Sequence, residues 1–75
     1  MTTITIPKGT HSRLRAMETV HDLALPGGVG TTEGVAFAVE DLSAIVSQLA
    51  PLSKKFPGCK AMITELKYYK AHVRD

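Results

Sequence analysis

The most distinctive chemical feature of the chain is a glycine-rich run at residues 26–34, which reads Pro-Gly-Gly-Val-Gly-Thr-Thr-Glu-Gly. Runs of this kind surround phosphate groups with backbone N–H donors. Nucleotide-binding loops add a lysine directly after the last glycine of the loop, where it reaches the β- and γ-phosphates. Here Thr31 and Thr32 follow Gly30 instead. The run therefore lacks the positive charge that a nucleotide site needs.

The string Gly27-Gly28-Val29-Gly30 resembles the nucleotide-binding loop of ParA-like ATPases, in which Lys and Thr follow the same four residues. That resemblance would imply ATP binding. Such a loop must follow a buried strand, however, and the segment before this run has the pattern of a helix. We therefore expect no nucleotide and no other cofactor. The run is interpreted as a connector between two helices, with the N–H groups of Thr31 to Gly34 free to hold a phosphate of a larger molecule.

The remaining reactive side chains do not specify an enzyme. Cys59 follows Pro57-Gly58 at a predicted helix start, where a thiolate is stabilised, but no base is tied to it by spacing. His21 and Asp22 are adjacent, so on a helix they do not face each other. The histidines have no cysteine neighbours at the spacing of a zinc site: His11, His21 and His72. We predict a protein without catalytic activity and without a metal.

Composition favours a small folded protein of the cytoplasm. The chain has 75 residues, of which 44% are hydrophobic, and this share argues against disorder. A single cysteine forms no intramolecular disulfide, which suits a reducing compartment. No apolar run approaches the roughly 20 residues that span a bilayer, and the first residues do not have the pattern of a signal peptide. We expect one domain over residues 1–75, in the cytoplasm and without membrane contact.

The net charge of +2 hides a segregation of charge along the chain. Residues 1–17 carry bases and no acid, residues 18–50 carry acids and no base, and residues 51–75 carry mostly bases. Basic ends fit an anionic partner, and an acidic middle fits a basic partner.

The first element predicted is a strand at residues 2–6, because threonine and isoleucine alternate there and Pro7 cannot continue a ladder. A lone strand of this length is not stable by itself. Since no second strand is evident in the sequence, the predicted partner is the same strand of a second copy.

Three helices are predicted after the strand, at residues 11–25, 31–50 and 59–73. Each has apolar residues at helical spacing, for example Leu14 and Met17 in the first. Thr10 or Ser12 would cap the first helix, and Thr31 or Thr32 the second. The predicted fold class is mainly α, with a short N-terminal β-strand followed by three helices and strand pairing between the subunits of a dimer. The alternative is a monomeric small helical bundle.

Three short motifs carry a further resemblance: Ile4-Thr5-Ile6-Pro7, Arg13-Leu14-Arg15-Ala16-Met17 and Gly30-Thr31-Thr32-Glu33. Over about residues 2–49 the chain resembles the ribbon–helix–helix family of DNA-binding regulators. The resemblance implies a homodimer whose paired strands enter the major groove of double-stranded DNA. It implies base contacts from Thr3, Thr5 and Lys8. The predicted phosphate contacts are Arg13, Arg15, Thr31, Thr32, Lys54 and Lys55.

The predicted function is therefore that of a small, non-enzymatic, DNA-binding transcriptional repressor. The alternative is a protein-binding inhibitor or adaptor of the kind found among phage and mobile-element proteins. That alternative uses the acidic face within residues 18–50, with Glu33, Glu40 and Asp41 as contacts.

Overall fold

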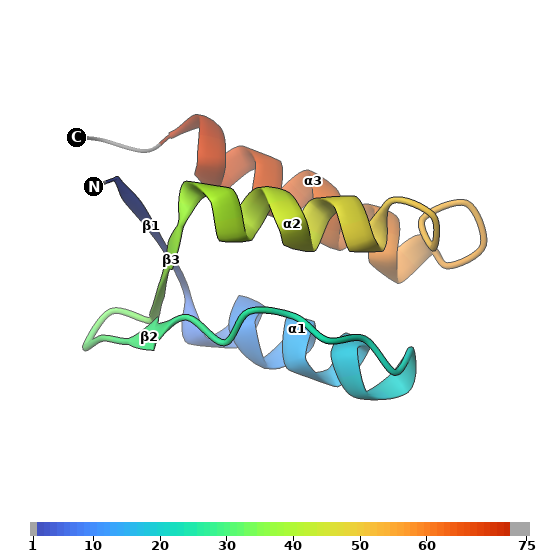
Figure 1. The fold of residues 1–75 in the computed structure, drawn as a ribbon, viewed down its shortest axis with the longest axis horizontal. Coiled ribbons are helices and arrows are strands. Elements are labelled where there is room, and N and C mark those ends of the chain that lie inside the picture. The colour runs from blue at the N-terminus through green and yellow to red at the C-terminus, as the bar shows by residue number, and fades with distance from the viewer. Residues whose placement is uncertain (1, 73–75) are drawn as a thin grey trace.

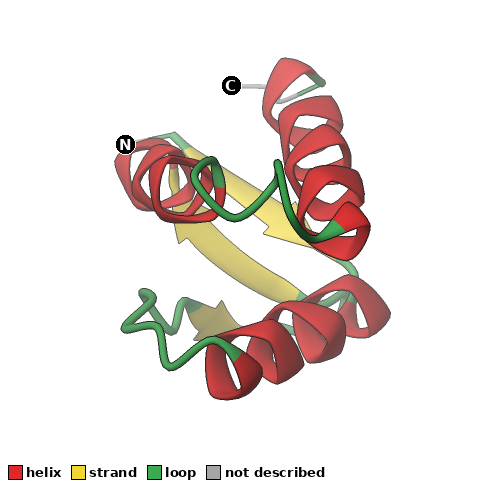
Figure 2. Ribbon diagram, turned by 90° about the vertical axis from the view of Figure 1, so that its right-hand side faces the viewer, coloured by secondary structure: helices red, strands yellow, loops and turns green. Residues whose placement is uncertain are grey.

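The computed structural model describes residues 2–72, which form three helices and a three-stranded antiparallel sheet in a small α/β fold. The elements are β1 (Thr3–Ile6), α1 (Lys8–Val20), β2 (Val29–Gly30), β3 (Val35–Ala38), α2 (Val39–Leu49) and α3 (Pro57–Ala71). In the sheet, β3 lies between β1 and β2. The helices extend from one side of the sheet (Figure 1), and a view from that side shows them in front of the strands (Figure 2). One face of the sheet is therefore covered, and the other is not.

The predicted N-terminal strand is confirmed as β1. Ile4 and Ile6 are buried, and Thr3 and Thr5 are exposed, as the alternation requires. The expectation that the chain offers no second strand is wrong, because β1 pairs antiparallel with β3 of the same chain, with Ile4 opposite Phe37. The strand pairing between two copies stays a prediction.

The first helix begins and ends earlier than predicted, at Lys8–Val20 instead of residues 11–25. Pro7 precedes it in an extended conformation, and the Pro7 carbonyl accepts the N–H of His11 at 3.0 Å. Neither Thr10 nor Ser12 caps the helix, because it starts before them. It ends where Asp22 adopts a positive φ of 54°, a conformation that Asp tolerates better than most residues.

The predicted helix at residues 31–50 is wrong for its first eight residues. Residues 31–34 form the turn between β2 and β3, and residues 35–38 are β3 itself. The Thr31 Oγ1 accepts the N–H groups of Glu33 at 3.2 Å and Gly34 at 3.1 Å. The Thr31 N–H donates to the Gly34 carbonyl at 2.8 Å. Thr31 therefore closes a turn through side chain–backbone hydrogen bonds of the kind that also cap a helix. For this reason the sequence around Thr31 does not distinguish a turn from a helix start.

The helix within that segment, α2, begins at Val39 and ends at Leu49, before Pro51 as expected. Glu40 and Asp41 lie in its first turn, where acids complement the positive end of the helix dipole. Its buried residues recur at spacings of three and four, the spacing of one helical face: Leu42, Ile45 and Leu49.

The last helix, α3, begins at Pro57 rather than at Cys59. Proline suits the first turn of a helix because its missing N–H has no partner there in any case. The predicted end at Val73 lies outside the described residues. The buried core joins both long strands to all three helices: Ile4, Ile6, Leu14, Phe37, Leu42, Ile45, Leu49, Cys59, Met62 and Leu66.

Candidate functional site

The uncovered face of the sheet gathers residues from all three strands. The register places Thr3 opposite Ala38 and Thr5 opposite Ala36, and Val29 pairs with Ala36 from the other side. Opposite residues in an antiparallel pair point to the same face. Because Ile4, Ile6 and Phe37 point into the core, these five point away from it. We call them the open sheet face: Thr3, Thr5, Val29, Ala36 and Ala38.

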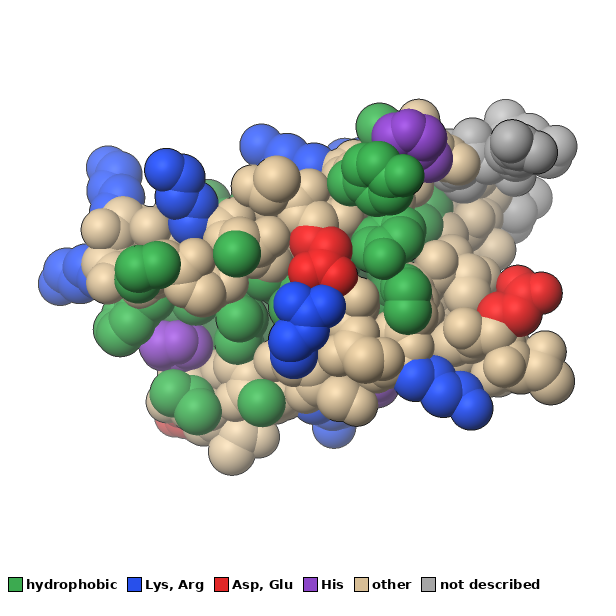
Figure 3. All heavy atoms as spheres, turned by 180° about the vertical axis from the view of Figure 1, so that it is seen from behind, with side chains coloured by type: hydrophobic (Ala, Val, Ile, Leu, Met, Phe, Trp, Pro, Cys, Tyr) green, Lys and Arg blue, Asp and Glu red, His purple; other side chains and the backbone are tan. Residues whose placement is uncertain are grey.

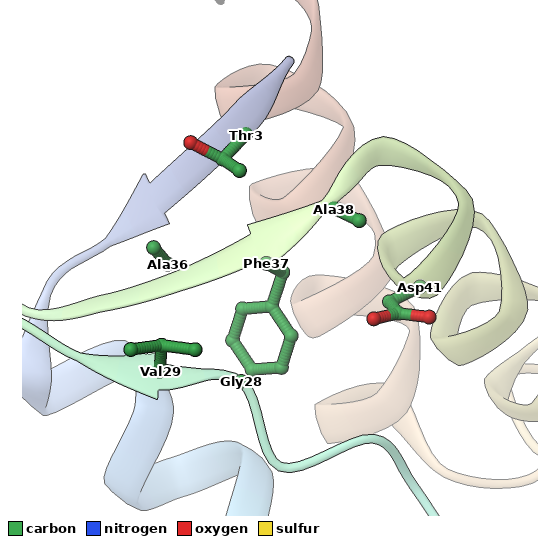
Figure 4. A pocket seen from close by; sticks show the side chains of 7 residues that line it. All are labelled: Thr3, Gly28, Val29, Ala36, Phe37, Ala38 and Asp41. Atoms are coloured by element: carbon green, nitrogen blue, oxygen red, sulfur yellow. The ribbon is translucent and has the colours of Figure 1, made fainter. Parts of the chain in front are cut away.

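An open pocket of about 500 Å³ lies on this face. Its lining joins the sheet to the start of α2: Thr3, Gly28, Val29, Ala36, Phe37, Ala38 and Asp41 (Figure 4). The walls are mainly apolar. Asp41 contributes a carboxylate to this lining, and Thr3 contributes a hydroxyl.

Gly28 gives the pocket its shape. A Cβ at this position would lie 2.6 Å from the Cγ1 of Val35 and 2.8 Å from the Cζ of Phe37, and the φ of Gly28 is +70°. Glycine is the residue that takes this conformation and this close approach without strain. The ring of His11 packs near the ring of Phe37, with their centroids 6.0 Å apart. Phe37 is therefore held between α1 and the residues that lead into β2.

The predicted base-contact residues lie near one another. Thr3 and Thr5 are exposed on the open sheet face, and Lys8 is exposed at the first position of α1, just beyond the end of β1.

The predicted phosphate contacts do not gather on one face. Thr31 is engaged in its turn, and Thr32 is exposed beside it. Lys54 and Lys55 lie in the connection between α2 and α3, at the end of the molecule away from the sheet (Figure 1). On the face seen in Figure 3, several Lys and Arg side chains lie near one another at the left-hand end, and others stand apart from them.

The two arginines of α1 are paired with acids. Arg15 contacts Glu18 at 2.9 Å, one helical turn away. Arg13 donates two hydrogen bonds to Glu65 of α3, at 2.9 and 2.7 Å, and the buried Thr10 hydroxyl donates to the same carboxylate at 2.6 Å. These bonds, first that from Arg13 and then that from Thr10, hold the pKa of Glu65 below its ordinary value. The network ties α1 to α3.

The predicted acidic contacts are divided between the two ends of β3. Glu33 lies in the turn before β3, whereas Glu40 and Asp41 follow its other end. Of the three, Asp41 lines the pocket.

Folding also creates a contact that the sequence did not indicate, between Cys59 and His21. The Cys59 Sγ lies 3.6 Å from the His21 Nε2, and the His21 ring packs on Phe56 with centroids 4.5 Å apart. A thiol beside an imidazole resembles part of a nucleophilic pair. Cys59 is 1% exposed, however, and a buried thiol of this kind is inert toward substrates in solution. The pair packs α1 against α3.

The two adjacent tyrosines of α3 have different surroundings. Tyr69 packs against the core, whereas Tyr68 is 58% exposed and stacks on His72 with centroids 4.2 Å apart.

Residues 2–72 contain no cluster of three or more His, Cys, Asp or Glu side chains placed to hold a metal ion. Within the same residues, no helix has the length and apolar character needed to span a bilayer. Comparison of the chain with protein-family models, with curated proteins and with solved structures finds no match.

Proposed function

We propose that this chain is a small, non-enzymatic protein-binding module, an adaptor or inhibitor, whose partner protein covers the open sheet face. The observation that carries the proposal is the uncovered face itself, with its pocket beside Asp41. We place the protein in the cytoplasm, where the single thiol stays reduced.

The side chains of the open sheet face support a protein partner. An antiparallel sheet with one solvated face normally carries polar residues on that face. Here Val29, Ala36 and Ala38 take such positions, and Val29 is 68% exposed. Apolar residues grouped on an uncovered surface are typical of interaction sites. Small side chains also let a partner approach the strands closely.

Capture of the partner from an extract of the native host tests the proposal, with two valine variants as a matched pair. Val29→Asp puts a charge on the open sheet face, and Val20→Asp puts the same charge at the end of α1, where Val20 is 76% exposed. Both positions are exposed, so both variants are expected to fold. The partner should be lost with Val29→Asp and retained with Val20→Asp. Equal retention by both variants rejects the open sheet face as the binding surface.

A DNA-binding repressor is the second candidate, because the exposed Thr3 and Thr5 lie close to the exposed Lys8. Thr hydroxyls and methyl groups can both contact base edges. The position of Lys54 and Lys55 at the end of the molecule away from the sheet gives this candidate less support. It also needs the predicted homodimer, so a strict monomer at tens of micromolar contradicts it.

Fluorescence anisotropy with a mixed-sequence duplex at low salt tests this second candidate. Binding should be saturable and should weaken as salt is added, because phosphate contacts release counterions. Lys8→Gln should weaken binding more than Lys55→Gln, which lies at the far end of the molecule. Absence of any anisotropy change rejects DNA binding.

A further inference from the structure

The carboxylate of Asp41 has unused hydrogen-bonding capacity. Among residues 2–72, Glu65 and Glu18 form ion pairs with arginines, whereas Asp41 makes neither an ion pair nor a side-chain hydrogen bond. Asp41 is half-buried and belongs to the lining of the pocket. A carboxylate in that position is an acceptor for a group that enters the pocket.

The walls of the pocket determine what kind of group fits. Val29, Ala36 and Ala38 offer apolar surface next to that one carboxylate, and Phe37, which is 1% exposed, also borders the pocket (Figure 4). Long cationic side chains have the matching character, since their methylene stems lie along apolar surface while the charged head reaches a polar partner. The pocket volume of about 500 Å³ admits such a side chain.

Arginine fits this lining better than lysine does. Its planar guanidinium binds a carboxylate through two parallel hydrogen bonds, whereas a lysine ammonium acts as a strongly hydrated point charge. Asp41 supplies the carboxylate for such a pair of bonds.

We propose that the pocket binds an arginine side chain of the partner protein, with the guanidinium on Asp41 and the stem against Val29 and Ala38. This inference rests on the proposed function and names the chemistry of the partner at the same site. The other role open to Asp41 is to complement the dipole of α2, a role that Glu40 in the same turn shares.

Titration of the labelled protein with two small probes, followed by amide chemical shifts, tests the inference. The probes are N-acetyl-arginine amide and N-acetyl-citrulline amide, which has nearly the same shape and no charge. The arginine probe should shift the signals of Val29, Ala38 and Asp41 in a saturable manner. The citrulline probe should bind about tenfold more weakly, because a hydrogen-bonded charge pair is lost.

Two substitutions of the same type localise the effect. Asp41→Asn should weaken binding of the arginine probe by about the same factor of ten. Asp22→Asn should leave it unchanged, because Asp22 is exposed at the end of α1, and Asn also tolerates its positive φ. The probe comparison on the unsubstituted protein needs no variant, so it remains decisive if Asp41→Asn destabilises α2.

The outcomes separate this inference from the proposed function. Equal binding of the two probes, or equal effects of the two substitutions, overturns the arginine inference. If Val29→Asp nevertheless abolishes capture of the partner, the open sheet face remains the binding surface without an arginine in its pocket. Saturable arginine binding combined with partner capture that Val29→Asp does not affect would instead contradict the proposed function.

Discussion

Gly34 is the residue at which the turn comes closest to β1. A Cβ on Gly34 would collide with the carbonyl oxygen of Ile6 and lie 3.2 Å from the Cα of Pro7. These are backbone atoms, which cannot move aside as the end of a side chain can. Gly34→Ala should therefore lower the free energy of unfolding by about 1–3 kcal/mol or more, the usual cost of overpacking.

Chemical denaturation measures that loss, and Gly27→Ala is the matched control. Apart from its two neighbours in the chain, no heavy atom of the described part of the protein lies within 4 Å of a Cβ at Gly27. The control should therefore change stability by no more than about 0.5 kcal/mol, as expected of surface positions. Equal stability of the two variants would mean that the turn does not pass against Ile6 as described.

The network of Thr10, Arg13 and Glu65 makes stability depend on pH. Because the folded-state pKa of Glu65 is lowered, its contribution is complete above the ordinary Glu pKa of about 4.3. The contribution declines as the pH falls and is lost as the pH passes through the lower folded-state pKa. Thermal unfolding at a series of pH values should give the wild type a higher melting temperature than Glu65→Gln at neutral pH. The two melting temperatures should converge in acid.

Glu33→Gln is the control for this pH series, because Glu33 is exposed in a turn and its side chain takes part in neither of the two ion pairs described. The melting temperature of Glu33→Gln should differ little from that of the wild type at every pH. A difference in melting temperature between the wild type and Glu65→Gln that persists in strong acid would contradict the lowered pKa of Glu65.

At the scale of elements, the boundary between β3 and α2 is where sequence reasoning failed. Val35, Val39 and Leu42 have helical spacing, and Val35 and Phe37 also have the spacing of a strand. The pairing of β3 with β1 decides between these patterns, and that partner lies about thirty residues away. The alternation of β1 and the end of the second helix before Pro51 depend on local signals, and both were predicted correctly.

Substitutions at Thr31 and Thr32 test whether these residues form a turn or start a helix. The hydroxyl of Thr31 accepts two backbone N–H groups, whereas the exposed side chain of Thr32 makes no hydrogen bond within residues 2–72. Thr31→Val should therefore cost about 1 kcal/mol of unfolding free energy, whereas Thr32→Val should be close to neutral. Chemical denaturation of the two variants measures the difference, and the reverse order would contradict the turn.

At the scale of the whole molecule, the site could be predicted only in part. The exposure of Thr3 and Thr5 follows from alternation, and Asp41 stood out as an acid in a base-free segment. The gathering of Val29, Ala36 and Ala38 on one face depends on strand order, which no spacing in the sequence reveals. The contact between Cys59 and His21 was missed for the same reason, since it joins residues 38 positions apart.

Interface mapping shows whether a partner protein covers the open sheet face. Amide chemical shifts of the labelled protein would be followed while the captured partner is added. We expect the largest changes on the open sheet face: Thr3, Thr5, Val29, Ala36 and Ala38. Largest changes at the end of the molecule away from the sheet, such as at Lys54 and Lys55, with the sheet signals unmoved, would contradict it.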